Sequence, residues 1–432
     1  MTVPSQRLLV FAAAIGVPAA SLAGLYPSLF APCVLILAVS VLIATLDAFR
    51  GAGRIRAIEV STPPFLRFTK NVAGPLPITI RNGSAGPVAL RVGVTLPDTI
   101  HSETVVEETT APPGACSIEW PVLCRARGDY RLEALHLETP SPFGLWLLRD
   151  TRPVGFRFRV YPNLRDRATA ALFRKTANAG LRMRRQVGKG REFDNLRHYV
   201  AGDSFEDIHW KATARRAFPV VKLYRVEHAQ EVYAVIDASR LSAREGVLDS
   251  YVDAALHLAL VAERQGDRFG LVTFSDRTHR FVRARNGLDH FRLCRETIYN
   301  LHARRVSPDF RDVFNTLQVN LRRRSLLVFF TSLDDALLAE TFGREAPLVA
   351  RRHVMLVNIT QTAGMKPLFT DDPPAGLDAL YDNLAGQMIW NRMRALQISL
   401  QNRGVRLYMV QPGRIKAEVT SEYLEVKRRQ LL

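Results

Sequence analysis

The first part of the chain is continuously apolar. No charged residue occurs from Leu8 to Leu46. Because one helix needs about 20 apolar residues to cross a bilayer, the run predicts two consecutive transmembrane helices. They cover residues 8–25 and 29–46, with a turn at residues 26–28. A cleaved signal peptide would explain only the first half, and a buried hairpin in a soluble protein would have to hide two helices without a polar face.

The pattern then changes to short alternating or β-branched segments. Examples are residues 76–80, 88–96, 117–121 and 130–137. Turn residues separate them at close intervals, as in Pro112-Pro113-Gly114. Many short strands with this spacing predict a small β-sandwich-like domain.

From Glu231 onward, apolar strand segments alternate with segments of helical period. The first strand is predicted at residues 232–236 and the last at 405–410, with a long helix at 377–400 between them. This alternation predicts a doubly wound α/β domain, in which helices cover a mostly parallel sheet.

These patterns divide the chain into four parts. We predict a transmembrane hairpin at residues 1–50, a β-rich domain at 51–163, a basic connector with an unusual charged stretch at 164–230, and the α/β domain at 231–432. The 59 Lys and Arg outnumber the 41 Asp and Glu, giving a net charge of +18. Such an excess is typical of a solvated surface or of positive residues on the cytoplasmic side of a membrane, and the alternative is an acidic or nucleic-acid partner.

The flanking charges orient the predicted hairpin. Arg7 precedes the first helix, and Arg50, Arg54 and Arg56 follow the second, whereas the turn between the helices carries no Lys or Arg. The positive-inside rule then places both ends in the cytoplasm. We therefore expect a two-span protein of the inner (cytoplasmic) membrane with a soluble body in the cytoplasm.

Residues 188–224 have the highest density of unusual side chains. Ser204 can cap a helix predicted from Phe205 to Arg216, with Trp210 turned outward, and Pro219 ends it before an extended run. The candidate contact residues of the chain are Glu192, Arg197, Tyr199, Gly202, Asp203, His209, Trp210, Lys211 and Arg215.

This stretch resembles the signature of a bacterial family known only as uncharacterised domain fifty-eight. The family pattern is G-x-E-F, then L-R-x-Y-x-x-G-D, then I-H/D-W-K-x-S/T-A-R. The matching residues here are Gly190, Glu192, Phe193, Leu196, Arg197, Tyr199, Gly202, Asp203, Ile208, His209, Trp210, Lys211, Thr213, Ala214 and Arg215. One position departs, because Glu206 stands where the family often has Arg.

The resemblance extends into the β-rich part, to residues 125–130 and 141–145. The family carries an R-G-x-Y strand followed by a D-P-F-G-L turn, and Ser141 stands here in the place of the Asp. We expect a structural role for this turn. Family members are often encoded beside MoxR-type AAA+ ATPases and are thought to act with them as adaptors. The resemblance thus implies a membrane-anchored, non-catalytic adaptor that docks to such an ATPase through a von Willebrand factor A-like domain.

A second resemblance follows the first strand of the α/β part. The run Asp237-Ala238-Ser239-Arg240-Leu241-Ser242 resembles the metal-dependent adhesion motif D-x-S-x-S of von Willebrand factor A domains. Asp237 and Ser239 match and are the candidate metal residues, and hard oxygen ligands of this kind suit Mg²⁺. Leu241 replaces the second Ser, and Ser332 replaces a later Asp. The alternative is that Asp237 and Ser239 cap the following turn.

Two other functions remain open. An enzyme would use acid–base groups of the signature, namely Glu192, His198, Asp203, Asp207 and His209. No pair of them has metal or triad spacing, and Asp203 is expected to cap a helix or to pair with Arg197 or Arg215, so we expect no enzyme. A nucleic-acid-binding protein would use the basic residues 164–191, but zinc-finger spacing and aromatic RNA-binding motifs are missing, so we expect no nucleic-acid partner.

Overall fold

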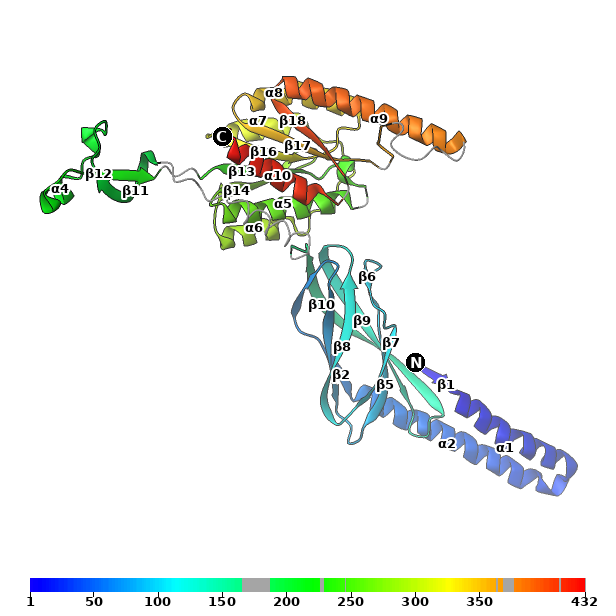
Figure 1. The fold of residues 1–432 in the computed structure, drawn as a ribbon. Helices are drawn as coiled ribbons and strands as arrows, with labels where there is room; N and C mark the ends of the chain where they lie inside the picture. Colours follow the sequence, from blue (N-terminus) through cyan, green and yellow to red (C-terminus); the bar gives the residue numbers. More distant parts are fainter. Residues whose placement is uncertain are drawn as a thin grey trace. The chain divides into compact units, whose positions relative to one another are not determined.

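The computed structural model describes residues 1–164, 187–225, 229–244, 246–362, 364–367, 377–411 and 413–431, without the side chains of 187–195, 223–225 and 379. The chain forms two compact units, Met1–Asn163 and Leu164–Leu432 (Figure 1). Most of the predicted basic connector lies outside the described residues.

The first unit contains an apolar helical hairpin. Helices α1 (Gln6–Leu25) and α2 (Phe30–Arg56) pack against each other and are joined by a 3-10 turn, η1 (Pro27–Leu29). Both are long and apolar enough to cross a membrane, and only 6% and 11% of the residues in their apolar stretches are buried. Core helices of a soluble protein are mostly buried, so this exposure argues against a hidden hairpin.

Helix α2 continues well past its predicted end at Leu46. The continuation contains no proline, and its inward residues Gly51 and Ile55 are buried. A Cβ atom on Gly51 would come within 2.5 Å of the Leu148 side chain. The last turns of α2 therefore pack on the β-rich part of the first unit, and the glycine permits that close approach.

The β-rich part consists of two sheets, as predicted for a segment with many short strands. One sheet has the order β1-β10-β9-β5-β7, with β3 pairing parallel to β10, and the other has the order β2-β4-β8-β6. The strands are β1 (Thr2–Pro4), β2 (Ile58–Ser61), β3 (Phe65–Thr69), β4 (Ala73–Asn82), β5 (Val88–Val94), β6 (Ile100–His101), β7 (Val106–Ala111), β8 (Gly114–Cys124), β9 (Gly128–Pro140) and β10 (Trp146–Tyr161).

Alternation along the strands builds one apolar core between the two sheets. In β4, Leu76, Ile78 and Ile80 are buried while the residues between them are half-buried. Trp120 on β8 and Leu137 on β9 lie in the same cluster, each 1% exposed. A period of two with one buried face is what a sheet packed on a second sheet requires.

One turn, residues 141–146, holds the base of α2, and we name it the anchor turn. The carboxylate of Asp47 on α2 is fully buried and accepts hydrogen bonds from Ser141 Oγ, from the Phe143 amide (2.9 Å) and from the Leu145 amide (3.3 Å). Trp146 Nε1 also donates to a backbone carbonyl of α2, at 2.8 Å. The anchor turn thus has the structural role expected from its sequence.

The same turn holds the start of α1. Ser5 caps α1 by accepting the Leu8 amide, donates its hydroxyl to the Gly144 carbonyl (2.6 Å), and donates its amide to the Leu145 carbonyl (3.0 Å). Gly144 adopts φ of 72°, a left-handed conformation that glycine tolerates best. Both helices of the hairpin therefore leave the β-rich part from one fixed point.

The second unit contains a six-stranded sheet of order β15-β14-β13-β16-β17-β18. All its strand pairs are parallel except β14 with β15. The strands are β13 (Glu231–Asp237), β14 (Arg268–Phe274), β15 (Thr278–Arg285), β16 (Ser325–Phe330), β17 (Val354–Thr360) and β18 (Val405–Val410). The predicted mostly parallel sheet is therefore present, with an antiparallel edge.

Helices cover both faces of this sheet (Figure 1). Alternate residues of β13 face opposite cores, Ile236 toward α5 and α10, and Val235 toward α7 and α8. The helices are α5 (Val247–Arg264), α6 (Leu288–Ile298), α7 (Phe310–Asn320), α8 (Ala336–Ala350), α9 (Leu377–Asn402) and α10 (Ile415–Arg428). Strands buried on both faces are continuously apolar, which explains why β13 and β16 are prominent in the sequence.

Candidate functional site

The family-like stretch forms a β-hairpin with a helical insertion. Strands β11 (Val187–His198) and β12 (Val220–Arg225) pair antiparallel, and η2 (Phe205–Asp207) and α4 (Trp210–Arg216) lie between them. The predicted single helix over 205–216 is wrong in its middle. Ile208 is buried and bridges to Val221, which pulls the backbone into an extended conformation between the two helical pieces.

Two signature side chains hold the insertion in place. His209 caps α4, because its Nδ1 accepts the Ala212 amide at 3.2 Å. Arg197 on β11 donates to Asp203 Oδ1 at 2.5 Å. Asp203 also accepts the Val200 amide at 2.9 Å, and the Arg197 hydrogen bond holds the pKa of its carboxyl below the ordinary range. Of the two partners that the sequence left open for Asp203, the structure places Arg197 beside it.

The outer face of α4 consists of Trp210, Lys211, Ala214 and Arg215, all exposed. Trp210 is 68% exposed, as expected from its outward position in the sequence pattern. The opposite face is held to β12, where Thr213 Oγ1 accepts the Val220 amide at 3.1 Å. A short helix fixed on one side thus presents an indole and two cations to solvent.

The preceding loop adds further exposed apolar area. Phe205 is 73% exposed and Val200 59% exposed. The Tyr199 and Phe205 rings lie 6.0 Å apart, and Gly202 between them adopts φ of 109°, which favours glycine. Large exposed apolar side chains grouped in one module are typical of an interaction surface.

The acid–base candidates whose side chains the structure describes are not assembled into a catalytic group. Asp203 and His209 are used in the ion pair and the helix cap described above. His198 stacks on Phe218 with 4.3 Å between ring centroids. The side chain of Glu192 lies outside the described residues. General acid–base catalysis needs groups within hydrogen-bond reach of one reacting atom, and the described signature residues show no such arrangement.

The second candidate site lies at the carboxyl edge of the parallel sheet. Asp237 ends β13 and is fully buried. Its Oδ1 accepts the Ser239 amide at 2.8 Å, its Oδ2 accepts Thr331 Oγ1 at 2.7 Å, and burial raises the pKa of its carboxyl. Ser239 Oγ accepts the Leu241 amide at 3.3 Å and caps η3 (Arg240–Ser242). Both residues therefore make the turn-capping contacts of the alternative reading.

Neighbouring carboxylates at this edge are held by arginines. Asp334 pairs with Arg244 at 2.6 Å. Asp335 pairs with Arg240 at 2.8 Å and caps α8 through its Oδ1. Each of these two carboxylates is therefore paired with an arginine. The contact of Thr331 with Asp237 was not predicted from the sequence. The signal for it was that Thr331 directly follows β16, the strand next to β13.

A cavity of about 410 Å³ is lined by residues that follow β13, β16 and β17, among them Leu241 and Ser332. Its lining includes the hydroxyl-bearing residues Ser250, Tyr251, Ser332, Thr360 and Thr362. The Oγ atoms of Ser332 and Ser242 are buried and have no hydrogen-bond partner among the described residues. These oxygens and Asp237 are the donors available to a Mg²⁺ ion.

This donor set does not fit Mg²⁺ held by the chain alone. Asp237 supplies one carboxylate whose two oxygens already accept hydrogen bonds. The described residues contain no group of three or more His, Cys, Asp or Glu side chains that could hold a metal. Mg²⁺ is usually bound by one or two carboxylates plus waters or other anionic oxygens, and the other carboxylate near this point, that of Asp334, is paired with Arg244.

We expect magnesium chloride to leave the unfolding temperature of the full chain in detergent unchanged relative to EDTA. The physical reason is that a ligand stabilises a fold only when it binds the native state. Differential scanning calorimetry of the wild type and of Asp237→Asn measures this. A magnesium-dependent rise that Asp237→Asn abolishes would show that the chain completes the site by itself.

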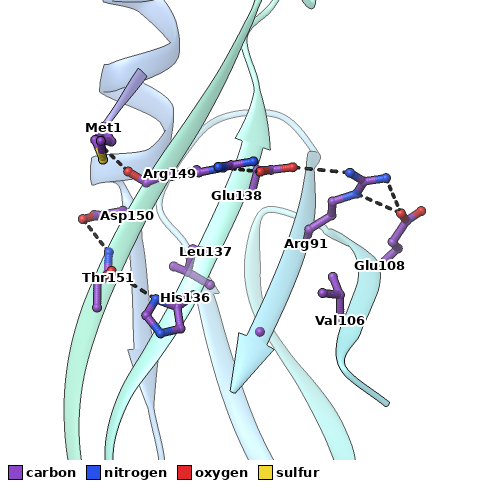
Figure 2. Close-up of a pocket in the computed structure, with 11 residues that line it drawn as sticks. Met1, Arg91, Val106, Glu108, His136, Leu137, Glu138, Arg149, Asp150 and Thr151 are labelled. Atoms are coloured by element: carbon purple, nitrogen blue, oxygen red, sulfur yellow. Dashed lines mark hydrogen bonds and ion pairs between the residues drawn. The ribbon is translucent and has the colours of Figure 1, made fainter. Parts of the chain in front are cut away.

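A larger groove lies on the outer face of the first unit's β1–β7 sheet, with a volume of about 940 Å³ (Figure 2). Its charged side chains form one row. Arg149 Nε lies 2.6 Å from Glu138, and Arg91 bridges Glu138 (3.4 Å) to Glu108 (2.7 Å). Because these charges neutralise one another, the groove offers no unpaired cation or anion in that row to a ligand.

Three solved structures align with parts of the chain. The crystal structure of the SpRpn10 VWA domain aligns with 12% identity and a TM-score of 0.28, covering 45% of this chain and 95% of that chain. The ASH/PapD-like domain of human CEP192 aligns with 11% identity and a TM-score of 0.18, covering 25% and 87%. The C. elegans protein WR4, a member of the MSP family, aligns with 13% identity and a TM-score of 0.17, covering 24% and 97%.

The comparison with curated proteins yields no match. A family model, described as protein of unknown function DUF58, matches residues 195–390. The match includes Arg197, Asp203, Trp210 and Asp237, while the anchor turn lies outside it. The family expected from the signature is confirmed for residues 195–390, which match the DUF58 family model.

Proposed function

We propose that this chain is a membrane-anchored, non-catalytic adaptor that docks to a MoxR-type AAA+ ATPase. The observation that carries the proposal is the exposure of Trp210, 68% of whose surface meets solvent while the residues beneath it are fixed by hydrogen bonds. Exposed tryptophans beside arginine are characteristic of residues that dominate protein–protein binding energy. The association with such ATPases is what the resemblance to the family implies, and it enters here as part of the proposal.

Membrane anchoring in the proposal rests on the hairpin. Its apolar side chains are exposed along both helices, and water is an unfavourable environment for an area of that size. Arg7 lies at the start of α1, and Arg54 and Arg56 lie in the last turn of α2. Cations at these ends suit a hairpin whose two ends face the cytoplasm. The soluble body would then lie on the cytoplasmic side of the inner membrane.

The non-catalytic part of the proposal rests on how the ionisable groups are used. Asp203 is paired with Arg197, His209 caps a helix, and His198 is stacked on a phenylalanine. Each contact has a structural purpose, and a surface of this kind can bind a partner without reacting with it. On this view α4 presents the contact face, and the carboxyl edge of the sheet near Asp237 is a second contact region of the von Willebrand factor A-like domain.

We expect Trp210→Ala to abolish capture of the ATPase without lowering stability. The indole makes few contacts within the chain, so its loss removes binding area and leaves packing unchanged. The measurement is a pull-down from detergent-solubilised native membranes, with and without magnesium and ATP, read by mass spectrometry. Differential scanning calorimetry of the same variant reports stability.

Tyr381→Ala serves as the matched control, because Tyr381 on α9 is 66% exposed and lies far along the chain from α4. It should retain capture. Recovery of no AAA+ ATPase by the wild type under any condition would refute the partnership. Equal capture by the Trp210→Ala variant would remove α4 from the contact.

A further inference from the structure

The edge strand β15 carries a row of arginines without acidic partners. Arg277 lies in the turn before it, and Arg280, Arg283 and Arg285 lie on it, all exposed. None makes an ion pair or a side-chain hydrogen bond with a described residue. Neighbouring arginines differ in this respect, as Arg304 illustrates by pairing with Asp276 at 3.1 Å.

The strand itself is firmly held, so the row is a fixed surface. Phe281 and Ala284 pack on one core of the sheet, and Val282 packs on the other. The register against β14 shifts between Phe269 and Leu271, which marks a bulge in β15 around Arg283. Anchored apolar residues on a bulged strand leave the guanidinium groups to point outward.

Two residues build the bulge into the fold. Tyr233 on β13 reaches β15, where its hydroxyl oxygen accepts the Ala284 amide at 3.1 Å. Gly270 on β14 makes room for that ring, because a Cβ atom there would lie 2.3 Å from it. The bulge and the arginine row are thus determined by residues of the inner strands.

The open side of β15 can accept another strand. Within the described part of the chain, β15 pairs with β14 alone, so it is the edge of the sheet. Edge strands offer unpaired backbone groups, and peptides that add to such an edge gain affinity from main-chain hydrogen bonds and specificity from side chains.

The positive charge of β15 determines which kind of strand can pair with it. A second copy of β15 would place arginines against arginines, and like charges directly opposite in a sheet are destabilising. A strand with carboxylates at alternate positions would meet the guanidinium groups favourably. We infer that the β15 edge receives an extended acidic segment of a partner protein, added as a strand with its carboxylates on Arg280, Arg283 and Arg285.

Other polyanions fit this surface less well. Proteins that bind single-stranded nucleic acid stack bases on exposed aromatic rings, whereas Phe281, the aromatic residue of β15, packs into the core. Membrane surfaces are bound best when apolar side chains insert beside the cations, and the apolar residues of β15 face inward. The site is separate from α4, so it stands whether or not the adaptor proposal holds.

The test uses the full chain in detergent and a fluorescein-labelled short peptide of alternating Glu and Val, with binding read by fluorescence anisotropy. The triple variant Arg280→Glu/Arg283→Glu/Arg285→Glu should weaken binding by about tenfold or more. N-methylation of alternate peptide amides should abolish binding, because it removes the main-chain hydrogen bonds of strand addition.

The matched control is Arg322→Glu/Arg323→Glu/Arg324→Glu, which changes the same charge at three exposed arginines between α7 and β16. It should change the peptide dissociation constant by no more than about twofold. An equal loss of peptide affinity in the two triple variants would show that only the net charge of the protein matters, and it would overturn the inference. Unchanged binding of the N-methylated peptide, or tighter binding of oligothymidine or of phosphatidylserine vesicles, would also overturn it.

The glutamine version of the β15 variant, Arg280→Gln/Arg283→Gln/Arg285→Gln, guards against misfolding, because it introduces no new charge. It should keep the wild-type unfolding temperature and still weaken peptide binding. Wild-type affinity in this correctly folded variant would overturn the inference by itself.

Discussion

Asp47→Ala is expected to lower the free energy of unfolding of the first unit by about 3 kcal/mol, since it leaves several buried donors without an acceptor. Those donors are Ser141 Oγ and the amides of Phe143 and Leu145, and no other described acceptor faces them. The anchor turn holds both helices of the hairpin. In the Asp47→Ala variant we therefore expect the amides of this turn to exchange with solvent much faster than in the wild type.

The measurement is hydrogen–deuterium exchange of the full chain in detergent, read at residues 141–146, together with the unfolding temperature. Asp98→Ala is the control, because Asp98 is an exposed carboxylate of the same unit. Asp47→Asn should be milder, since an amide oxygen can still accept one or two of the bonds. Unaltered protection of Phe143 and Leu145 in Asp47→Ala would contradict the assignment.

Glu422→Gln is expected to stabilise the second unit at pH 8 and to have little effect near pH 4.5. Glu422 lies on α10, is 6% exposed, and neither carboxyl oxygen accepts a hydrogen bond from a described residue. Burial raises its pKa from 4.5 to about 8, and the charges of Glu418 and Glu425 add to the shift.

The sign follows from proton binding. The folded-state pKa lies above the unfolded value, so the folded state binds a proton that the unfolded state releases. The stability from protonated Glu422 is complete below pH 4.5 and is lost as the pH rises toward 8. A shift of this size corresponds to about 5 kcal/mol. Glutamine cannot ionise, so it should remove this pH dependence.

Differential scanning calorimetry between pH 5 and pH 8 checks the expectation. Glu422→Gln should raise the unfolding temperature of the second unit at pH 8 by about 5 °C or more. Glu340→Gln on α8 is the control, because Glu340 is exposed, pairs with Arg344, and is not among the groups that shift the pKa of Glu422. A wild-type unfolding temperature that does not fall across this pH range would show that Glu422 finds a partner when charged.

The sequence predicted the elements whose signal is local. The apolar run from Leu8 to Leu46 and the apolar strands of the parallel sheet are visible in short windows, because burial dictates their side chains. The end of α2 was missed for a physical reason. Charged residues mark the end of an apolar stretch, but they do not end a helix. The helix continues until a helix-breaking residue or a competing contact ends it, and α2 continues onto the β-rich part.

Contacts between distant residues were not predictable. Ser141 was recognised as a replacement for a family Asp, but the carboxylate that it contacts comes from Asp47, 94 residues away. The break at Ile208 has a similar origin, because its pairing with Val221 overrides local helix propensity. Arg197 and Asp203 lie six residues apart, and that short separation made their ion pair foreseeable.

Strand β1 has a consequence for the order of events during synthesis. Thr2 on β1 pairs with Leu148 on β10. Strand β1 therefore has no partner until the ribosome has made nearly the whole first unit. The hairpin emerges much earlier and, in the proposed membrane arrangement, enters the bilayer before its own docking turn exists. The hairpin would therefore insert first, and its contacts with the β-rich part would form last. On this order of events, β1 pairs with β10 only after the hairpin has entered the bilayer.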